Sequence, residues 1–338
     1  GDMQAFYFEP TAAVRRLLEA IKHHLSLIET EYELSEIYYF IRELYYNSGN
    51  SLVWLENSPD VRICISKKDI RWDIAELLYQ AGKSTILTSA TISSKQDGTP
   101  QERCSYFLDS IGYPEIGMVS ESKQSPYDYD HNTMLYCSAL MPFPKHERRE
   151  EYLKASIPEI VKLLNITNGK ALILFTSKTD MEYVYKKLSN MHLSYRILMQ
   201  SRTSSQEYQL NKFRNDVNSV LLGTGTYWEG INVEGESLSH VIIYTLPFPV
   251  PDPIIDYKMS LTEYPINDVA VPEMITKLRQ GAGRLIRSAN DKGIVSILDP
   301  RVSSNSRASY AKRTLRALPM KNRTENMAEL QEFWDRIS

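Results

Sequence analysis

The sequence predicts an α/β protein in which helices cover both faces of a parallel sheet. Between residues 85 and 298, short apolar segments of strand length alternate with longer segments whose apolar residues recur at helical spacing. Parallel strands need crossover connections, and right-handed crossovers place helices on the faces of the sheet. A length of 338 residues further indicates about two domains with a sizeable core.

The first part of the chain predicts helices. Apolar residues from Val14 to Ile28, and again from Leu34 to Tyr45, follow the pattern of two amphipathic helices. The polar tract at residues 47–50 ends the second one, and a third helix is expected around residues 74–78. These helices carry only solvated charges, so core packing is their expected role.

Strands dominate the rest of the pattern. We expect them at residues 85–87, 134–136, 171–175, 196–199, 220–222, 241–246 and 294–298, with helices between them such as 152–164 and 181–188. Ligands of parallel sheets bind beyond the carboxyl ends of the strands. The unusual residues of this sequence follow predicted strands, which makes that edge the expected site.

Composition excludes several classes of protein. The apolar runs are too short to span a bilayer, and the opening residues, which look like a cloning remnant on an excised piece, carry no secretory signal. A cytoplasmic protein is therefore expected, with no membrane partner. Cys64, Cys104 and Cys137 are too scattered for a disulfide framework, and neither they nor the six histidines have metal-ligand spacing, so no metal site is expected.

Charge gives no direct indication of a partner. The formal net charge is −3, which leaves no global basic footprint for nucleic acid. Nucleic-acid binding therefore has to be argued from motifs.

Gly82-Lys83-Ser84 matches the end of a phosphate-binding loop but fails the rest of the pattern. The first glycine of that loop would stand at position 77, which is Leu77, and the triplet precedes a predicted strand instead of opening a helix. A helix cap at Gly82 that leads into a strand is the better interpretation. The sequence also has no Asp-Glu pair after an apolar strand to bind magnesium, so the usual groups that hold ATP are missing.

Two hydroxyl-rich segments follow predicted strands. Residues 88–92 read Thr-Ser-Ala-Thr-Ile, and Thr176, Ser177 and Lys178 follow the strand at 171–175. Hydroxyls and a cation at a strand end suit a nucleic-acid backbone. Each segment is weak by itself, because Ser and Thr often simply end strands.

The segment 223–235 is more specific. It combines five glycines with Thr224, Thr226, Tyr227 and Trp228. Glycines permit close backbone approach, while hydroxyls and aromatic rings offer hydrogen bonds and a stacking face for bases. An ordinary strand-to-helix turn does not need this combination.

Residues 280–287 read Gln-Gly-Ala-Gly-Arg-Leu-Ile-Arg. In a helix, Arg284 and Arg287 would lie one turn apart on the same face, where both guanidinium groups could bind one anion. A solvated basic face is the plainer interpretation, which the preceding glutamine and glycines make less suitable.

In their order, these segments resemble helicase motifs III to VI of the XPD/DinG family in superfamily 2. The matching segments are residues 88–91, 174–177, 223–235, 246–249 with 252–253, and 280–287, with further landmarks at 125–129 and 299–301. The similarity extends over about residues 74–319. It implies a RecA-like parallel sheet with helices on both faces, the second helicase domain, preceded by a helical segment.

The resemblance also implies a division of the chain. Residues 1–60 would form a helical segment, residues 61–125 the last part of the first helicase domain with motif III and a connector, and residues 126–338 the second helicase domain. Motifs I and II would lie upstream. DinG-like proteins of some Gram-positive bacteria are similar and carry an exonuclease domain, which a longer parent of this chain would share.

Roles follow from the same resemblance. Arg284, Arg287 and Gln280 would be catalytic, facing the nucleotide, and Gly230, Asn232 and Gly283 would help to bind it. Thr176, Ser177, Lys178, Thr224, Tyr227 and Trp228 would bind single-stranded DNA.

The implied cofactor is ATP with Mg²⁺, shared with the first helicase domain, which would also be the partner domain. The chain alone is therefore not expected to hydrolyse ATP. The family's iron-sulphur cysteines belong to the first domain, so no such cluster is expected here. Asn232 stands where the family usually has aspartate, which removes a charge expected near the arginines.

Two other classes of function remain to be compared. Asn232 leaves open a non-catalytic nucleic-acid-binding module that has kept the fold and lost the chemistry. A nuclease would need an acidic cluster, which the sequence does not show.

Overall fold

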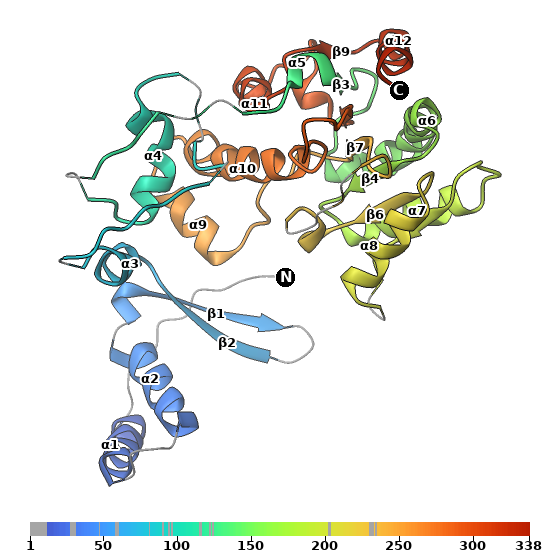
Figure 1. Cartoon of the computed structure of the whole chain (residues 1–338). Coiled ribbons are helices and arrows are strands. Elements are labelled where there is room, and N and C mark those ends of the chain that lie inside the picture. The colour runs from blue at the N-terminus through green and yellow to red at the C-terminus, as the bar shows by residue number, and fades with distance from the viewer. Residues whose placement is uncertain are drawn as a thin grey trace. The chain divides into compact units, whose positions relative to one another are not determined.

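The computed structural model describes residues 12–27, 32–46, 48–57, 61–80, 82–89, 91–93, 95, 97–114, 117–121, 123, 125–201, 204–229, 233 and 235–338. The chain forms two compact units, each assembled from separate stretches of sequence (Figure 1). The first unit comprises Gly1–Leu87, Leu108–Gly117 and Val250–Ala270, and the second comprises Thr88–Phe107, Met118–Pro249 and Val271–Ser338. The three continuous domains expected from the sequence stay a prediction.

The first unit combines helices with one antiparallel hairpin. Its elements are α1 (Ala12–Leu27), α2 (Tyr32–Tyr46), η1 (Ser48–Asn50), β1 (Ser51–Asn57), β2 (Val61–Lys67), α3 (Arg71–Leu78), α9 (Pro253–Ser260) and the π-helix η4 (Ile266–Ala270). The three predicted helices are confirmed. Asp252 begins α9, because its carboxylate accepts hydrogen bonds from the amides of Ile254 and Ile255, both 2.8 Å away.

Two predictions for the end of this region are wrong. Helix α3 ends at Leu78 with Tyr79 as its cap, and Gly82 lies beyond it in a turn with a φ of 78°. No strand forms at residues 85–87, where Ile86 is 89% exposed. A strand needs a neighbour for its backbone hydrogen bonds, and no described strand pairs with these residues.

The second unit contains a seven-stranded parallel sheet in the order β5-β6-β4-β7-β8-β3-β9. The strands are β3 (Thr133–Cys137), β4 (Ala171–Leu174), β5 (Ile197–Met199), β6 (Val220–Gly223), β7 (His240–Ile243), β8 (Gly293–Ile297) and β9 (Arg323–Thr324). The RecA-like α/β fold is confirmed, and every strand predicted after residue 130 is present, although β7 ends three residues earlier than expected.

Helices surround this sheet, as predicted. They are α4 (Pro100–Ser110), α5 (Tyr129–Asn132), α6 (Arg149–Thr167), α7 (Lys178–Ser189), α8 (Gln206–Asn215), α10 (Val271–Ala282), α11 (Ala311–Ala317) and α12 (Met327–Ile337), with short turns at η2 (His146–Arg148), η3 (Gly225–Tyr227) and η5 (Pro300–Val302). α4 extends past Phe107, where the division between the units falls.

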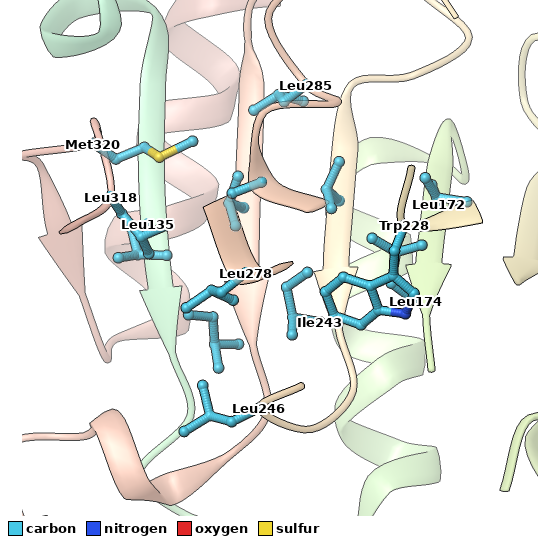
Figure 2. Packing of buried hydrophobic residues seen from close by; sticks show 14 of the residues in the cluster. Leu135, Leu172, Leu174, Trp228, Ile243, Leu246, Leu278, Leu285, Leu318 and Met320 are labelled. Atoms are coloured by element: carbon cyan, nitrogen blue, oxygen red, sulfur yellow. The ribbon is translucent and has the colours of Figure 1, made fainter. Parts of the chain in front are cut away.

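The side chains of the strands alternate between two cores. Leu172 and Leu174 pack with residues of α8, α10 and α11 on one face, whereas Ile173 packs with residues of α6, α7 and α12 on the other. Figure 2 shows the first of these cores. Burial on both faces explains why the strands read as continuous apolar runs.

None of the described helices has the length and apolar character needed to cross a membrane.

Candidate functional site

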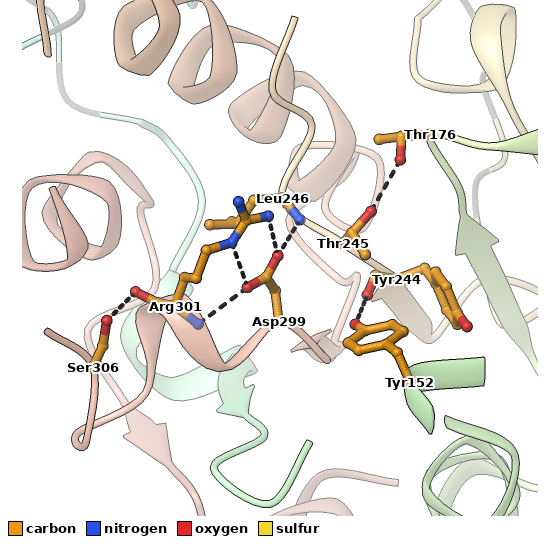
Figure 3. Close-up of polar contacts among 8 residues, drawn as sticks. All are labelled: Tyr152, Thr176, Tyr244, Thr245, Leu246, Asp299, Arg301 and Ser306. Carbon is orange, nitrogen blue, oxygen red and sulfur yellow. Dashed lines mark hydrogen bonds and ion pairs between the residues drawn. The ribbon is translucent and has the colours of Figure 1, made fainter. Parts of the chain in front are cut away.

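Two threonines meet at the carboxyl edge of the sheet. Thr176 follows β4 and Thr245 follows β7, and their hydroxyl oxygens lie 3.0 Å apart (Figure 3). The preceding residues, Phe175 and Tyr244, are buried with ring centroids 4.6 Å apart, which aligns the two strand ends. The Tyr152 hydroxyl of α6 donates to the Tyr244 carbonyl at 2.6 Å. Thr176 is exposed, so this hydroxyl pair faces solvent on a rigid base.

A buried ion pair holds the loop that follows Thr245. Asp299, fully buried at the end of β8, accepts hydrogen bonds from the Leu246 amide at 2.9 Å and from Arg301 (Figure 3). Burial lowers the pKa of Arg301, but its bonds to Asp299 outweigh burial and raise that pKa overall. The guanidinium also lies 4.8 Å from the centroid of the Phe248 ring. The Asp-Pro-Arg landmark therefore shapes the edge without offering its own charge.

The other predicted nucleic-acid contacts divide into exposed and occupied groups. Lys178 is exposed at the start of α7. The Ser177 hydroxyl accepts from the Asp180 amide at 3.2 Å and so caps this helix. Thr224 is only 4% exposed, and its amide and hydroxyl both donate to Gln200. We conclude that Thr176 and Lys178 present their polar groups, whereas the predicted role of Thr224 is wrong because the side chain is buried.

Tyr227 and Trp228 are core residues, so the predicted stacking surface is wrong. Their exposed fractions are 1% and 0%, which leaves no ring face for a base. The Trp228 indole lies among Leu174 and Ile243 (Figure 2), and its Nε1 donates to the Phe175 carbonyl at 2.8 Å. A β-carbon at Gly281 of α10 would come within 2.8 Å of this ring. Trp228 therefore joins the 223–235 segment to the end of β4 and to α10.

Arg284 and Arg287 lie in a turn instead of a helix, which corrects the predicted helical spacing. α10 ends at Ala282, and the amides of Gly283 and Arg284 donate to the carbonyls of Arg279 and Gly281 as the chain leaves the helix. The Arg284 Nε donates to the Gln280 carbonyl at 3.1 Å.

A carboxylate fixes the second half of this arginine turn, residues 283–288. Asp291 accepts the amide hydrogens of Arg287 at 2.7 Å and of Ser288 at 2.6 Å. The Tyr127 hydroxyl donates to the Arg287 carbonyl at 2.9 Å. Both arginine side chains are half-buried at positions that the backbone determines.

The arginine turn concentrates positive charge. Burial lowers the pKa of Arg284, and the neighbouring Arg287 lowers it further, while Glu229 acts in the opposite direction. Two cations held together in a partly dry environment favour an anion between them. Gln280 and Gly283 lie at the start of the same turn and are half-buried. Gly230 and Asn232 lie outside the described residues.

The hydroxyl pair and the arginine turn occupy opposite edges of the sheet. Thr176 and Thr245 follow the carboxyl ends of their strands, whereas the arginine turn follows α10 and precedes β8, at the amino edge. The expectation that all unusual residues gather at the carboxyl edge is thus wrong for the arginines. α10 runs between the two edges because it leads from the end of β7 back to the start of β8.

Some residues that shape these sites escaped the sequence analysis. Thr245 fell inside the predicted strand at 241–246, although a hydroxyl at the end of a strand beside Thr176 could have suggested the pair. Gln200 directly follows a predicted strand, and Asp291 lies four residues after Arg287, within reach of a turn. Polar residues at strand ends and turns were the available signal.

Comparisons with known proteins agree with this geometry. Residues 160–321 match the helicase C-terminal domain family. The chain is 31% identical over 254 residues to the 3'-5' exonuclease DinG of Bacillus subtilis, covering 73% of this chain and 26% of that protein. It is 30% identical over 263 residues to the ATP-dependent DNA helicase YoaA of Escherichia coli, covering 76% and 39%. The chain thus spans well under half the length of these relatives.

Solved structures show the same fold. An XPD helicase superimposes with a TM-score of 0.58 at 20% identity, covering 93% of this chain and 62% of that one. Xpd4 of S. tokodaii gives 0.60 at 14% identity, covering 96% and 61%.

A seven-stranded parallel sheet with an arginine turn beyond the helix that precedes β8 defines a RecA-like helicase domain. The chain belongs to the XPD/DinG family of superfamily 2 helicases, of which it is a C-terminal region.

Proposed function

We propose that the chain is the second half of an ATP-dependent DNA helicase motor, which supplies arginine fingers to a nucleotide and a surface for single-stranded DNA. Two relatives of this chain are named ATP-dependent DNA helicases, which supports the proposal. The nucleotide would be held mainly by a first helicase domain, because this sequence has no phosphate loop. The arginines would contact its phosphates from the opposite side.

The observation that carries this proposal is the arginine turn. Arg284 and Arg287 are held close together by backbone bonds to Gln280 and Asp291, before any anion binds. Preorganised cations stabilise the charge that develops on a transferred phosphoryl group, because they need no rearrangement during the reaction. ATP with Mg²⁺ supplies the reactive phosphate and its countercharge; these residues supply only the outer clamp.

The DNA surface would lie at the carboxyl edge, at Thr176, Thr245 and Lys178. Hydroxyls and an ammonium suit phosphate oxygens and carry no base preference. Since Tyr227 and Trp228 are buried, backbone contacts would contribute more here than stacking on those two rings.

Arginine substitutions in the full-length protein that contains this chain test the proposal. Arg284→Ala and Arg287→Ala should each lower ATP turnover by about 10³-fold or more while nucleotide affinity survives, because a finger acts on the transition state. Lysine at either position should rescue poorly, since it lacks the planar two-pronged grip. Steady-state ATPase and nucleotide binding are the measurements.

Arg196→Ala is the matched control, because Arg196 is an exposed arginine paired with Asp216 in the same unit. It should leave turnover unchanged. Losses below about tenfold at both fingers, or losses explained wholly by weaker binding, would contradict the proposal and favour a non-catalytic nucleic-acid-binding module.

A further inference from the structure

The segment Thr88–Phe107, which carries the hydroxyl-rich residues 88–92, belongs to the sheet-bearing unit. The resemblance had placed it with the first helicase domain. Two side-chain bonds join it to α10: the Arg279 guanidinium donates to the Ser93 carbonyl, and the Tyr106 hydroxyl donates to the Glu273 carboxylate, each at 2.5 Å. Both acceptors and donors come from elements more than 150 residues apart in sequence.

Arg279 is placed to hold this segment. It lies in the last turn of α10, where burial, with Cys104 and Tyr129 nearby, lowers the pKa of its guanidinium. A cation in such surroundings is costly unless its donors are satisfied, so its bond to the Ser93 carbonyl is difficult to give up.

The second bond is equally well sheltered. Burial raises the pKa of Tyr106, and the bond to Glu273 raises it further, so the hydroxyl stays protonated and donates. Hydrogen bonds to a carboxylate are about twice as strong as neutral ones. Glu273 lies in the first turn of α10, so the two bonds attach the segment at both ends of this helix.

The same helix ends in the arginine turn. The Arg279 carbonyl accepts the Gly283 amide hydrogen at 2.9 Å, which begins that turn, and the next residue, Gln280, holds Arg284. A displacement of the segment at Ser93 would therefore pull on the backbone that positions the fingers.

We propose that Arg279 and the Tyr106–Glu273 pair form a latch that ties residues 88–107 to the finger-bearing helix, so that nucleic-acid binding and ATP turnover are coupled through it. Arg279 is then a positioning residue and not a third finger. This role rests on the proposed function, because it assigns a task to Arg284 and Arg287.

Three variants probe the latch. Tyr106→Phe removes only the donating hydroxyl, and Arg279→Met keeps the length of the side chain but removes the donors. Glu273→Gln keeps an acceptor oxygen and should behave as wild type. Arg316→Gln is the matched control, because Arg316 forms an exposed ion pair with Asp97 of the same segment at 3.4 Å.

Hydrogen–deuterium exchange of this chain tests the contact itself. Amides in residues 97–107 should exchange about fivefold faster in Tyr106→Phe and Arg279→Met, while β4, β6 and β7 keep their protection. Unchanged exchange in both variants would overturn the latch, whatever the activity of the full-length protein.

ATPase of the full-length protein tests the coupling. The ratio of turnover with a single-stranded oligonucleotide to turnover without it should fall about fivefold or more in Tyr106→Phe and Arg279→Met, with KM for ATP changed by less than about twofold. Glu273→Gln and Arg316→Gln should keep the ratio.

Faster exchange with an unchanged ratio would overturn the proposal, because the contact would then be structural only. If wild-type full-length protein shows no ATPase at all, the proposed function fails and the coupling fails with it, whereas the exchange experiment still reports on the contact.

Discussion

Trp228 connects three parts of the domain through one side chain. Its ring packs against Gly281 of α10, and its indole nitrogen donates to the Phe175 carbonyl at the end of β4. The side chain is fully buried. Its contribution is therefore expected in stability and not in direct binding.

Trp228→Phe should lower the free energy of unfolding by about 1–3 kcal/mol, because it leaves the buried Phe175 carbonyl without its donor. Urea denaturation of both proteins measures this. Trp72→Phe is the control, since Trp72 is 82% exposed, and should change stability by less than about 0.5 kcal/mol. Unchanged stability together with weaker DNA binding would return Trp228 to the binding surface.

His240 makes the stability of the second unit depend on pH. It is fully buried, its Nε2 lies 2.7 Å from the Ser296 hydroxyl, and burial lowers its pKa to about 3. The unfolded chain binds the proton below about pH 6.5, whereas the folded chain does not until about pH 3. The stabilisation is thus complete above pH 6.5 and is lost as pH falls.

We expect the free energy of unfolding to drop by about 1.4 kcal/mol for each pH unit below 6 through His240. His240→Gln, which can still bond Ser296, should remove this slope between about pH 4.5 and 6, above the range where carboxylates titrate. Urea unfolding at several pH values compares the slopes, and equal slopes would mean that His240 is not the group responsible.

At the scale of single residues, the sequence predicted chemistry better than exposure. Thr176 and Lys178 are exposed as expected, but Thr224, Tyr227 and Trp228 are buried. Threonines and aromatic rings suit both a binding surface and a core, and the choice depends on what covers them. Here α10, about 50 residues further along the chain, covers the indole, and local sequence does not contain that information.

At the scale of elements, the buried strands were the most predictable. β4, β6 and β8 are apolar on both faces and flanked by helices, so length and composition were enough. The hairpin β1–β2 was not predicted, because residues 51–67 alternate only loosely. The end of α10 was also missed: Arg284 and Arg287 fit a continued helix by spacing, and the capping role of Asp291 depends on the fold of the turn.

The segment at residues 85–87 failed for a different reason. Its residues have strand character, but strand formation depends on a neighbour that supplies backbone partners. No described strand does so, and Ile86 remains exposed. Local preference was therefore right about the residues and insufficient for the element.

At the scale of the whole molecule, the chain should not hydrolyse ATP alone. Its sequence contains no phosphate loop, so the arginine turn has no phosphate and magnesium to act on. Phosphate release by the purified chain, with and without single-stranded DNA, is the measurement, and Arg287→Ala is the control for contamination. Release that depends on Arg287 would show that the chain holds a complete nucleotide site.

The separation of the hydroxyl pair and the arginine turn has a thermodynamic consequence. α10 connects their two edges with 12 residues, about 18 Å at 1.5 Å per residue. At that distance a strand and a nucleotide would not compete for the same atoms, so both could be bound together. Any influence between them would then obey reciprocity: by whatever factor the strand tightens the nucleotide, the nucleotide must tighten the strand. A domain built this way exchanges one ligand's affinity for the other's, so that emptying the amino edge also loosens the hold at the carboxyl edge.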